Sequence, residues 1–281
     1  MGTWTRPVRR ALDRMVDAEL RERYAALGVD LNAYGYDRWG ASRDDQLRSL
    51  ALLRWFHRTY FRVEAHGLEH VPDTGRALLI GNHSGQLAYD GMLVGSALFL
   101  DKDPPRMARA MIERFFIQTP IVGTMMTRMG QLTGIQENAE RLLTEEEAAV
   151  LVFPEGARGG GRVWAERYRV LGFSQGFLRL AMRTGTPVVP FAFIGGEEMC
   201  PSFSRGEPLA KLLGMPYVPL VPWGLPLPAP VKVHIHFGAP MRFEGTGDEE
   251  DEAVLPEVRR VEHAVSELIE LGLARRRGVF G

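Results

Sequence analysis

A histidine and an aspartate lie seven positions apart where an apolar run gives way to a glycine-containing turn. The run ALLI at 77–80 is followed by GNHSGQLAYD, which contains His83 and Asp90, and Asp90 opens an apolar helical segment. A carboxylate beside an imidazole fixes its tautomer and stabilises the imidazolium formed when it takes up a proton. His83 is therefore a candidate general base oriented by Asp90. The alternative is structural, with His83 hydrogen-bonded in the turn and Asp90 capping the next helix.

A second apolar run ends in a loop that could bind an anion. The segment VLVFPEGAR contains Glu155, Gly156 and Arg158 and continues into three glycines and Arg162. A guanidinium can donate two parallel hydrogen bonds to a phosphate or carboxylate, and glycine lets a ligand approach the backbone. Because ligands of α/β sheets gather beyond strand ends, this loop is a candidate binding element.

Three other patterns suggest different chemistry. GFSQG at 172–176 fits the nucleophile elbow of serine hydrolases, but no strong strand precedes it, and Ser174 is better interpreted as a helix N-cap. His234 and His236 alternate on one strand face and could ligate a metal, yet the sequence places no third ligand nearby. Cys200 has no adjacent histidine, so a cysteine nucleophile is not expected.

Strands and helices alternate along most of the chain, which favours an α/β fold with a largely buried sheet. An amphipathic helix is expected from about Pro256, and residues 1–62 read as a helical segment in which Ser42 or Asp44 could cap the second helix. Expected strands cover 77–80, 149–153, 188–194 and 231–237, and expected helices cover 91–100, 111–129, 137–147 and 174–184.

Composition excludes several classes of protein. The 281 residues are 45% hydrophobic and 25% charged, as in an ordinary globular chain, and the net charge of −1 indicates no nucleic-acid partner. A single cysteine excludes an internal disulfide framework. The N-terminus lacks an apolar core of signal-peptide length, so we expect a cytoplasmic protein. The charge-free stretch 212–231 contains six prolines, which excludes a transmembrane helix there.

Taken together, these blocks resemble the lysophospholipid and glycerol-phosphate acyltransferase family. The resemblance covers roughly residues 60–245 and rests on four segments in the family's order: NHSGQLAYD, GQLTGIQENAERLL, VFPEGAR and GTPVVPFAFIGGEE. It implies a mixed, largely parallel central sheet flanked by helices, with an N-terminal helical segment at 1–62 and an acyltransferase domain at 63–281.

The resemblance also implies a reaction, the transfer of an acyl group from acyl-CoA or acyl carrier protein to a lipid hydroxyl. His83 would deprotonate the hydroxyl and Asp90 would orient His83, with neither an acyl-enzyme nor a metal, and with no permanently bound cofactor. Backbone N–H groups near Ser84–Gly85 or in the Glu155–Gly156 turn would hold the oxyanion. Substrate contacts are expected from Asn82, Gly85, Glu155, Gly156, Arg158 and Pro190.

The acceptor has two candidates. Arg158 favours a phosphorylated lyso-lipid. The commonest family spacing places four residues between the histidine and the aspartate, whereas this chain has six, and LTGIQEN lacks the arginine of many members. Longer spacings occur in relatives resembling monoacylglycerol and diacylglycerol acyltransferases, so a neutral glyceride is the alternative. A serine esterase using Ser174 and a non-catalytic lipid-binding protein are the other functions that the sequence leaves open.

A lipid acceptor requires contact with a bilayer, and two segments are candidates for it. LLRWFHRTYFRV at 52–63 alternates arginines with aromatic side chains, which suits a lipid headgroup boundary. The proline-rich stretch 212–231 is the second candidate. For each segment the alternative is ordinary packing on the protein itself. We therefore expect peripheral association with the inner face of the membrane.

Overall fold

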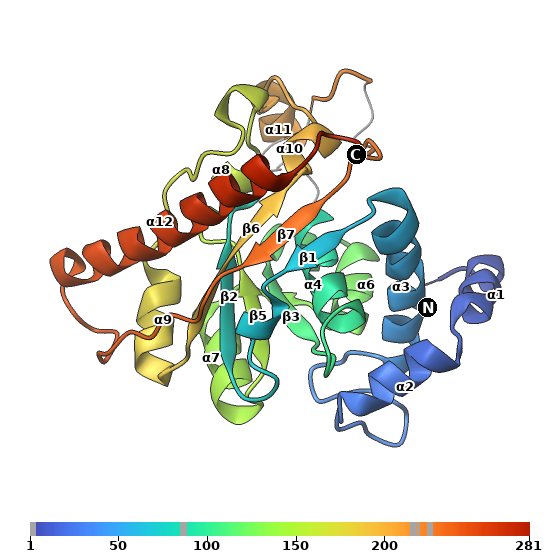
Figure 1. Ribbon diagram of the computed structural model, residues 1–281. Coiled ribbons are helices and arrows are strands. Elements are labelled where there is room, and N and C mark those ends of the chain that lie inside the picture. The colour runs from blue at the N-terminus through green and yellow to red at the C-terminus, as the bar shows by residue number, and fades with distance from the viewer. Residues whose placement is uncertain (1–3, 85–88, 214–217, 219, 224–226) are drawn as a thin grey trace.

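In the computed structural model, a seven-stranded mixed sheet forms the centre of the molecule (Figure 1). The structure describes residues 4–84, 89–213, 218, 220–223 and 227–281. The strand order is β1-β7-β6-β2-β5-β3-β4. The five strands from β6 to β4 in this order run parallel to one another, and β7 runs antiparallel to β6. The strands are β1 (Glu64–His66), β2 (Ala77–Gly81), β3 (Ala108–Ile112), β4 (Leu132–Thr133), β5 (Ala149–Val152), β6 (Val188–Ile194) and β7 (His234–Phe237).

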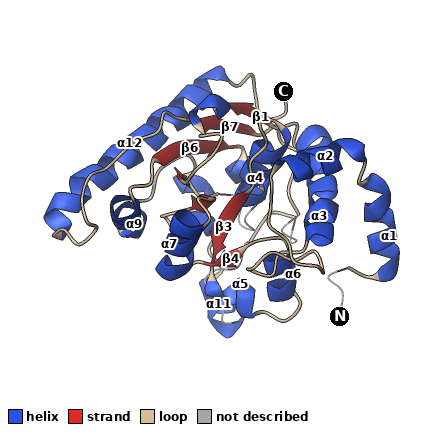
Figure 2. Cartoon of the chain, turned by 90° about the horizontal axis from the view of Figure 1, so that it is seen from below, coloured by secondary structure: helices blue, strands red, loops and turns tan. Residues whose placement is uncertain are grey.

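The central strands are apolar because helices cover both of their faces. Every residue of β2 and β6 is buried, as continuous runs of apolar residues in parallel sheets predict. One layer consists of α7 (Gln136–Glu145), α9 (Gly176–Thr184) and α12 (Asp251–Arg275), whose side chains form one core cluster with the sheet. On the other face, α4 (Tyr89–Leu100) and the aromatic residues around Phe61 form a second cluster. Figure 2 shows these helices on opposite sides of the sheet.

The N-terminal helices pack on the end of α4. They are α1 (Arg6–Met15), α2 (Ala18–Ala26) and α3 (Arg43–Trp55), followed by a π-helical turn, η1 (Phe56–Tyr60). Leu20 and Leu50 form a third cluster with Phe99 and Leu100 of α4. Ser42 is the N-cap of α3 and accepts a hydrogen bond from the Asp45 N–H. The N-terminal segment is thus continuous in packing with the sheet domain.

Short elements complete the chain, several of them at the end of the sheet where β2, β5 and β6 terminate (Figure 1). They are η2 (Leu68–His70), α5 (Arg114–Gln118), α6 (Val122–Arg128), α8 (Ala157–Gly160), η3 (Trp164–Glu166), α10 (Gly196–Met199) and α11 (Glu207–Leu213). In Figure 1, α8, α10 and α11 gather at that end.

The α/β prediction is confirmed, with four corrections. The sequence predicts a single helix at 111–129, but this segment contains the end of β3 followed by α5 and α6. The prediction missed β3 because the strand is short and flanked by polar residues, so it does not stand out from the helical segments beside it. The last strand begins at His234 rather than 231. The last helix begins at Asp251 and holds Pro256 in its interior. Ser174 is exposed and is not a cap: Gln175 is the N-cap of α9 and makes no side-chain capping bond.

Candidate active site

Two adjacent parallel strands deliver the candidate site residues to one edge of the sheet. Ile80 of β2 pairs with Val152 of β5, so the chain segments that follow these strands leave the sheet side by side. The first segment carries His83 and the second carries Glu155. Ligands of open α/β sheets bind beyond such carboxyl ends. The topology therefore brings the two blocks noted in the sequence into contact.

Asp90 lies directly against His83. The His83 Nδ1 is 2.6 Å from the Asp90 Oδ2, which also accepts a hydrogen bond from the Ser84 N–H at 2.8 Å. The other carboxylate oxygen accepts from the Gly91 N–H at 2.7 Å. The Asp90 side chain is fully buried, so its three donors replace the water that a carboxylate would otherwise need. This side chain positions the imidazole and also closes the first turn of α4.

The contact determines which nitrogen of His83 is free. A carboxylate only accepts hydrogen bonds, so Nδ1 is the donor and Nε2 carries the lone pair of the neutral ring. The ring stacks on Phe153 with centroids 4.5 Å apart, and the side chain is 15% exposed. Burial opposes the imidazolium, but the charge and hydrogen bond of Asp90, together with the charge of Glu155, outweigh it and raise the pKa of His83 above its usual value. His83 has the geometry of a general base that acts through Nε2.

Glu155 holds the same histidine by its backbone. Its Oε2 accepts from the His83 N–H at 2.8 Å, and its Oε1 accepts from the Leu171 N–H at 2.6 Å. Gly159 of α8 packs against the corner formed by His83 and Glu155, which we call the His83 corner. A Cβ at Gly159 would lie 2.6 Å from the Glu155 Oε2 and 2.8 Å from the His83 Cβ. The glycine run of the loop therefore serves close packing of α8 on the turn after β2.

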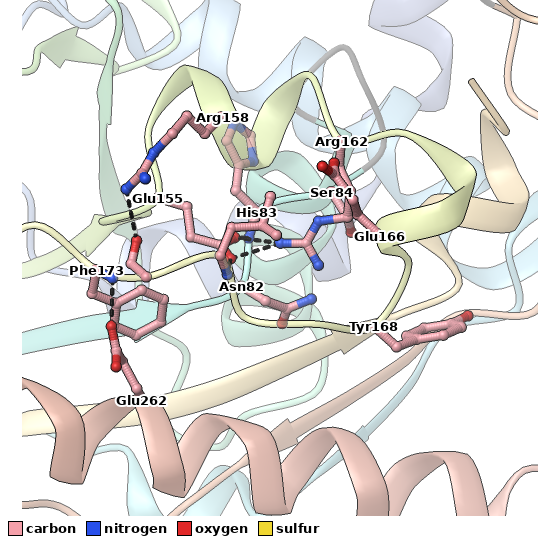
Figure 3. Close-up of polar contacts among 12 residues, drawn as sticks. Asn82, His83, Ser84, Glu155, Arg158, Arg162, Glu166, Tyr168, Phe173 and Glu262 are labelled. Atoms are coloured by element: carbon pink, nitrogen blue, oxygen red, sulfur yellow. Dashed lines mark hydrogen bonds and ion pairs between the residues drawn. The ribbon is translucent and has the colours of Figure 1, made fainter. Parts of the chain in front are cut away.

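Arg162 neutralises Glu155, and the sequence did not single out this role. Its Nη2 lies 2.7 Å from both oxygens of Glu155 (Figure 3). Its Nη1 lies 3.3 Å from the Glu197 Oε1. All three side chains are at most 3% exposed. Burial raises the pKa of Glu197, against the nearby charge of Arg162. The only signal in the sequence was an arginine after a glycine run, which does not distinguish a buried cation from an exposed one.

Arg158 takes a different direction from Arg162. It is exposed on α8, and its Nη2 donates to the Gly172 carbonyl at 3.1 Å. Figure 3 shows its guanidinium directed toward the segment before Phe173, away from the Glu155–Arg162 pair. It is next in sequence to Gly159, which packs against His83. Arg158 therefore lies on the solvent side of the helix that borders the His83 corner.

The other residues expected to contact substrate are placed as follows. The side-chain amide of Asn82 is buried and bonds both the N–H and the carbonyl of Phe193, so it joins the end of β2 to β6. Pro190 lies inside the sheet, in register with Ile80, and packs against Gly238 rather than the His83 corner. Gly156 precedes α8 with a φ of 58°, a conformation that favours glycine. Gly85 lies outside the described residues.

Two of the N–H groups expected near the oxyanion have other acceptors. The Ser84 N–H donates to Asp90, and the Gly156 N–H donates to the Phe153 carbonyl at 3.0 Å. Ser84 is buried, and among the described residues its hydroxyl has no hydrogen-bond partner. The sequence could not show that these amides are used to build the turn itself.

The alternative nucleophiles have little structural support. No strand lies directly before Ser174, within the described part of the chain, because residues 169–175 are irregular. Cys200 is buried, and burial raises the pKa of its thiol to about 12. A thiol in that state is not a nucleophile near neutral pH.

Comparison with known proteins supports the acyltransferase assignment. Residues 62–194 match the Acyltransferase family model, and this part of the chain is an acyltransferase-family domain. An uncharacterized protein of Mycobacterium tuberculosis is 34% identical over 240 residues, covering 82% of this chain and 66% of the relative. A 1-acyl-sn-glycerol-3-phosphate acyltransferase of Limnanthes alba is 28% identical over 143 residues, which are 47% of this chain and 45% of that protein.

A solved structure shares the fold. The chain is similar to the 1-acyl-sn-glycerophosphate (LPA) acyltransferase PlsC of Thermotoga maritima, with a TM-score of 0.54 and 17% identity over 84% of this chain and 83% of the other. The glycerol-phosphate acyltransferase-like fold is thereby confirmed. Among the described residues, no helix is both long enough and apolar enough to span a bilayer.

The buried ion pair predicts a stability effect that is separate from catalysis. Replacing Arg162 by Met leaves the carboxylates of Glu155 and Glu197 without their shared cation, and we expect the free energy of unfolding to fall by about 3–5 kcal/mol. Urea titration followed by circular dichroism measures the change. The exposed Arg169→Met is the matched control. Equal stability of the two variants would show that Arg162 does not hold the buried carboxylates together.

Proposed function

We propose that this chain is an O-acyltransferase that moves a fatty acyl group from an acyl thioester to a hydroxyl of a lyso-phospholipid or glycerolipid. The observation that supports the proposal best is the 2.6 Å contact of His83 with the buried Asp90, inside an acyltransferase-family domain. The donor would be acyl-CoA or acyl carrier protein. Catalysis would need no metal and no permanently bound cofactor.

The proposed reaction uses the free nitrogen of His83. Nε2 takes the proton of the acceptor hydroxyl as its oxygen attacks the thioester carbonyl, while Asp90 stabilises the imidazolium. The tetrahedral intermediate then collapses, the C–S bond breaks, and the departing thiolate takes the proton from the imidazolium. The acceptor supplies the nucleophilic oxygen, so no acyl-enzyme forms. Glu155 acts as a positioning residue, because it holds the backbone N–H of His83 rather than the reacting atoms.

Arg158 is our proposed contact for an acceptor phosphate. Its guanidinium is exposed and donates one N–H to the Gly172 carbonyl, so its other N–H groups remain available for a bidentate bond to a phosphate. A phosphorylated lyso-lipid is therefore the acceptor that this arrangement favours, and a neutral glyceride is the competing one.

We also propose that the chain binds the inner membrane surface peripherally. At the sheet end that carries α8 and α11, exposed apolar side chains gather on the segment 203–227: Phe203, Leu209, Leu212, Leu220, Trp223 and Leu227. The two candidate segments from the sequence meet beside them, since the Tyr60 hydroxyl donates to the Pro228 carbonyl and Arg62 donates to the Pro230 carbonyl. Exposed apolar side chains in such number are typical of an interaction surface.

The first test removes the base. His83→Ala is expected to lower kcat by roughly 10²–10⁴, because the hydroxyl must then react without a positioned proton acceptor. Free-thiol release from acyl-CoA or acyl carrier protein is measured with lyso-phospholipid and monoacylglycerol acceptors. Ser174→Ala is the control and should retain full activity. Loss of activity in Ser174→Ala with none in His83→Ala would favour a serine esterase, and lipid binding without thioester consumption would favour a non-catalytic protein.

The second test reads the pKa of His83. Proton abstraction needs the neutral imidazole, so kcat/KM should decline as pH falls through a pKa that is raised above 6.5. In Asp90→Asn the counter-charge is gone while burial remains, so this decline should shift to lower pH and the maximal rate should drop. The measurement is kcat/KM from about pH 5 to about pH 9. An unshifted profile in Asp90→Asn would contradict the assigned pair.

The third test concerns the membrane. The double variant Leu212→Gln/Leu227→Gln removes side chains that are 80% and 63% exposed. Each apolar side chain transferred from water contributes roughly 1.5–3 kcal/mol, so partition onto anionic vesicles should weaken at least about tenfold. Flotation at low salt measures it, with Leu255→Gln/Leu271→Gln on α12 as the control. If the wild-type chain does not float with vesicles, peripheral binding is excluded.

A further inference from the structure

Four polar side chains lie together at the β1 edge of the sheet, where β7 and β6 separate β1 from β2 and from the His83 corner. β1 pairs with β7 in parallel, with Glu64 opposite His234 and His66 opposite His236. Because side chains two apart on a strand share a face, this register places three imidazoles and a carboxylate on one face. Figure 1 shows β7 between β6 and the short β1. The sequence paired only the two histidines of β7, since their partners are some 170 positions earlier.

The ligand atoms of three of these residues converge. One oxygen of Glu64, one nitrogen of His66 and one of His234 all lie within 4.8 Å of one another. The Glu64 Oε2 is 3.5 Å from the His234 Nδ1 and 4.0 Å from the His66 Nε2. Ligands bound to one tetrahedral ion at about 2.0–2.1 Å are separated by about 3.4 Å. The three side chains are therefore close to coordination geometry, and only small side-chain rotations are needed to reach it.

The buried histidines have unused hydrogen-bonding capacity. His234 is 6% exposed and His236 is 2% exposed, and the Nε2 of each has no partner among the described residues. His234 faces Glu64 with its Nδ1, so its unpartnered Nε2 is not the nitrogen that would bind an ion, and the candidate site rests on the convergence of Glu64, His66 and His234. The His236 ring stacks on that of His66 with centroids 4.6 Å apart, and it packs against Gly272 of α12. His236 thus supports the ring of His66 from behind.

Lys232 holds the carboxylate of Glu64 through only one of its two oxygens. Its Nζ lies 2.7 Å from the Glu64 Oε1, which leaves Oε2 turned toward the two histidines. Hydrogen bonding of this sort to the second oxygen of a ligating carboxylate is a common outer-shell arrangement. The pairing holds Glu64 in the orientation that coordination requires.

We propose that Glu64, His66 and His234 bind a divalent transition-metal ion of the Zn²⁺ type, with solvent as the remaining ligand. Two imidazoles and one carboxylate are a donor set that suits zinc. Glu64 and His66 are about half exposed, so an ion can reach the site from solvent. The ion would join the three-residue strand β1, which follows the N-terminal helices, to β7. Its role is to stabilise the sheet edge, and it takes no part in acyl transfer.

The test uses the full chain after treatment with a chelator. We expect calorimetry to show one saturable Zn²⁺ site, and Zn²⁺ at about 100 times its Kd to raise the Tm by several degrees. Co²⁺ substituted for Zn²⁺ should show the visible absorption of a four-coordinate site. His66→Ala and Glu64→Gln change exposed side chains, so both should fold, and each should bind Zn²⁺ at least about tenfold more weakly.

The control separates this site from ordinary surface histidines. His263 is 76% exposed on α12 and lies 3.3 Å from Glu267, a pair that could bind metal weakly without a built site. His263→Ala should leave affinity, stoichiometry and the Tm rise unchanged. The proposal would be overturned if the wild-type chain had no saturable Zn²⁺ site, or if His66→Ala and His263→Ala lost Zn²⁺ affinity to the same extent. Neither result depends on acyltransferase activity.

Discussion

The buried negative charge of Asp90 is the interaction on which the candidate site depends. An ionised carboxylate without partners is very costly in an apolar interior, so Asp90 must keep all three of its donors. Those donors are the backbone of Ser84, the backbone of Gly91 and the ring of His83. The same requirement therefore fixes the turn after β2, the start of α4 and the tautomer of His83. The Nε2 of His83 is oriented as a consequence of how the turn is stabilised.

Glu155 imposes a second constraint on the same residue from the neighbouring strand. Asp90 holds the ring of His83, whereas Glu155 holds its backbone N–H, so the histidine is fixed at two points. Glu155 can be buried because Arg162 supplies the compensating charge, and Arg162 in turn reaches Glu197. Rigid placement of a base is what converts a hydroxyl held nearby into an effective nucleophile. Four buried ionisable side chains, those of Asp90, Glu155, Arg162 and Glu197, are thus linked to the position of one imidazole.

The sequence predicted the parts of this arrangement that are local. The apolar runs at β2 and β6 predict buried strands, and His83 and Asp90 are close enough in the sequence for their side chains to meet. It did not separate Arg158 from Arg162, since both are arginines beside glycines and only the packing of α8 decides which is buried. It did not find the partners of His234, because strand order is a property of the whole sheet. It also missed β3, a short strand flanked by polar residues whose partners, β4 and β5, both come later in the chain.

The direction of the strands also explains why the site and the apolar surface share one end of the molecule. β2, β5 and β6 all terminate there, so the connections that follow them, with α8, α10 and α11, must be built at that end (Figure 1). One of these connections carries Glu155, and another continues into the exposed apolar side chains of 203–227. In the proposed reaction, a lipid hydroxyl would have to leave the membrane interface and reach the imidazole of His83, whose side chain is only 15% exposed. Placing both features on loops from neighbouring strands shortens that path, and a parallel sheet provides such neighbours at its carboxyl edge.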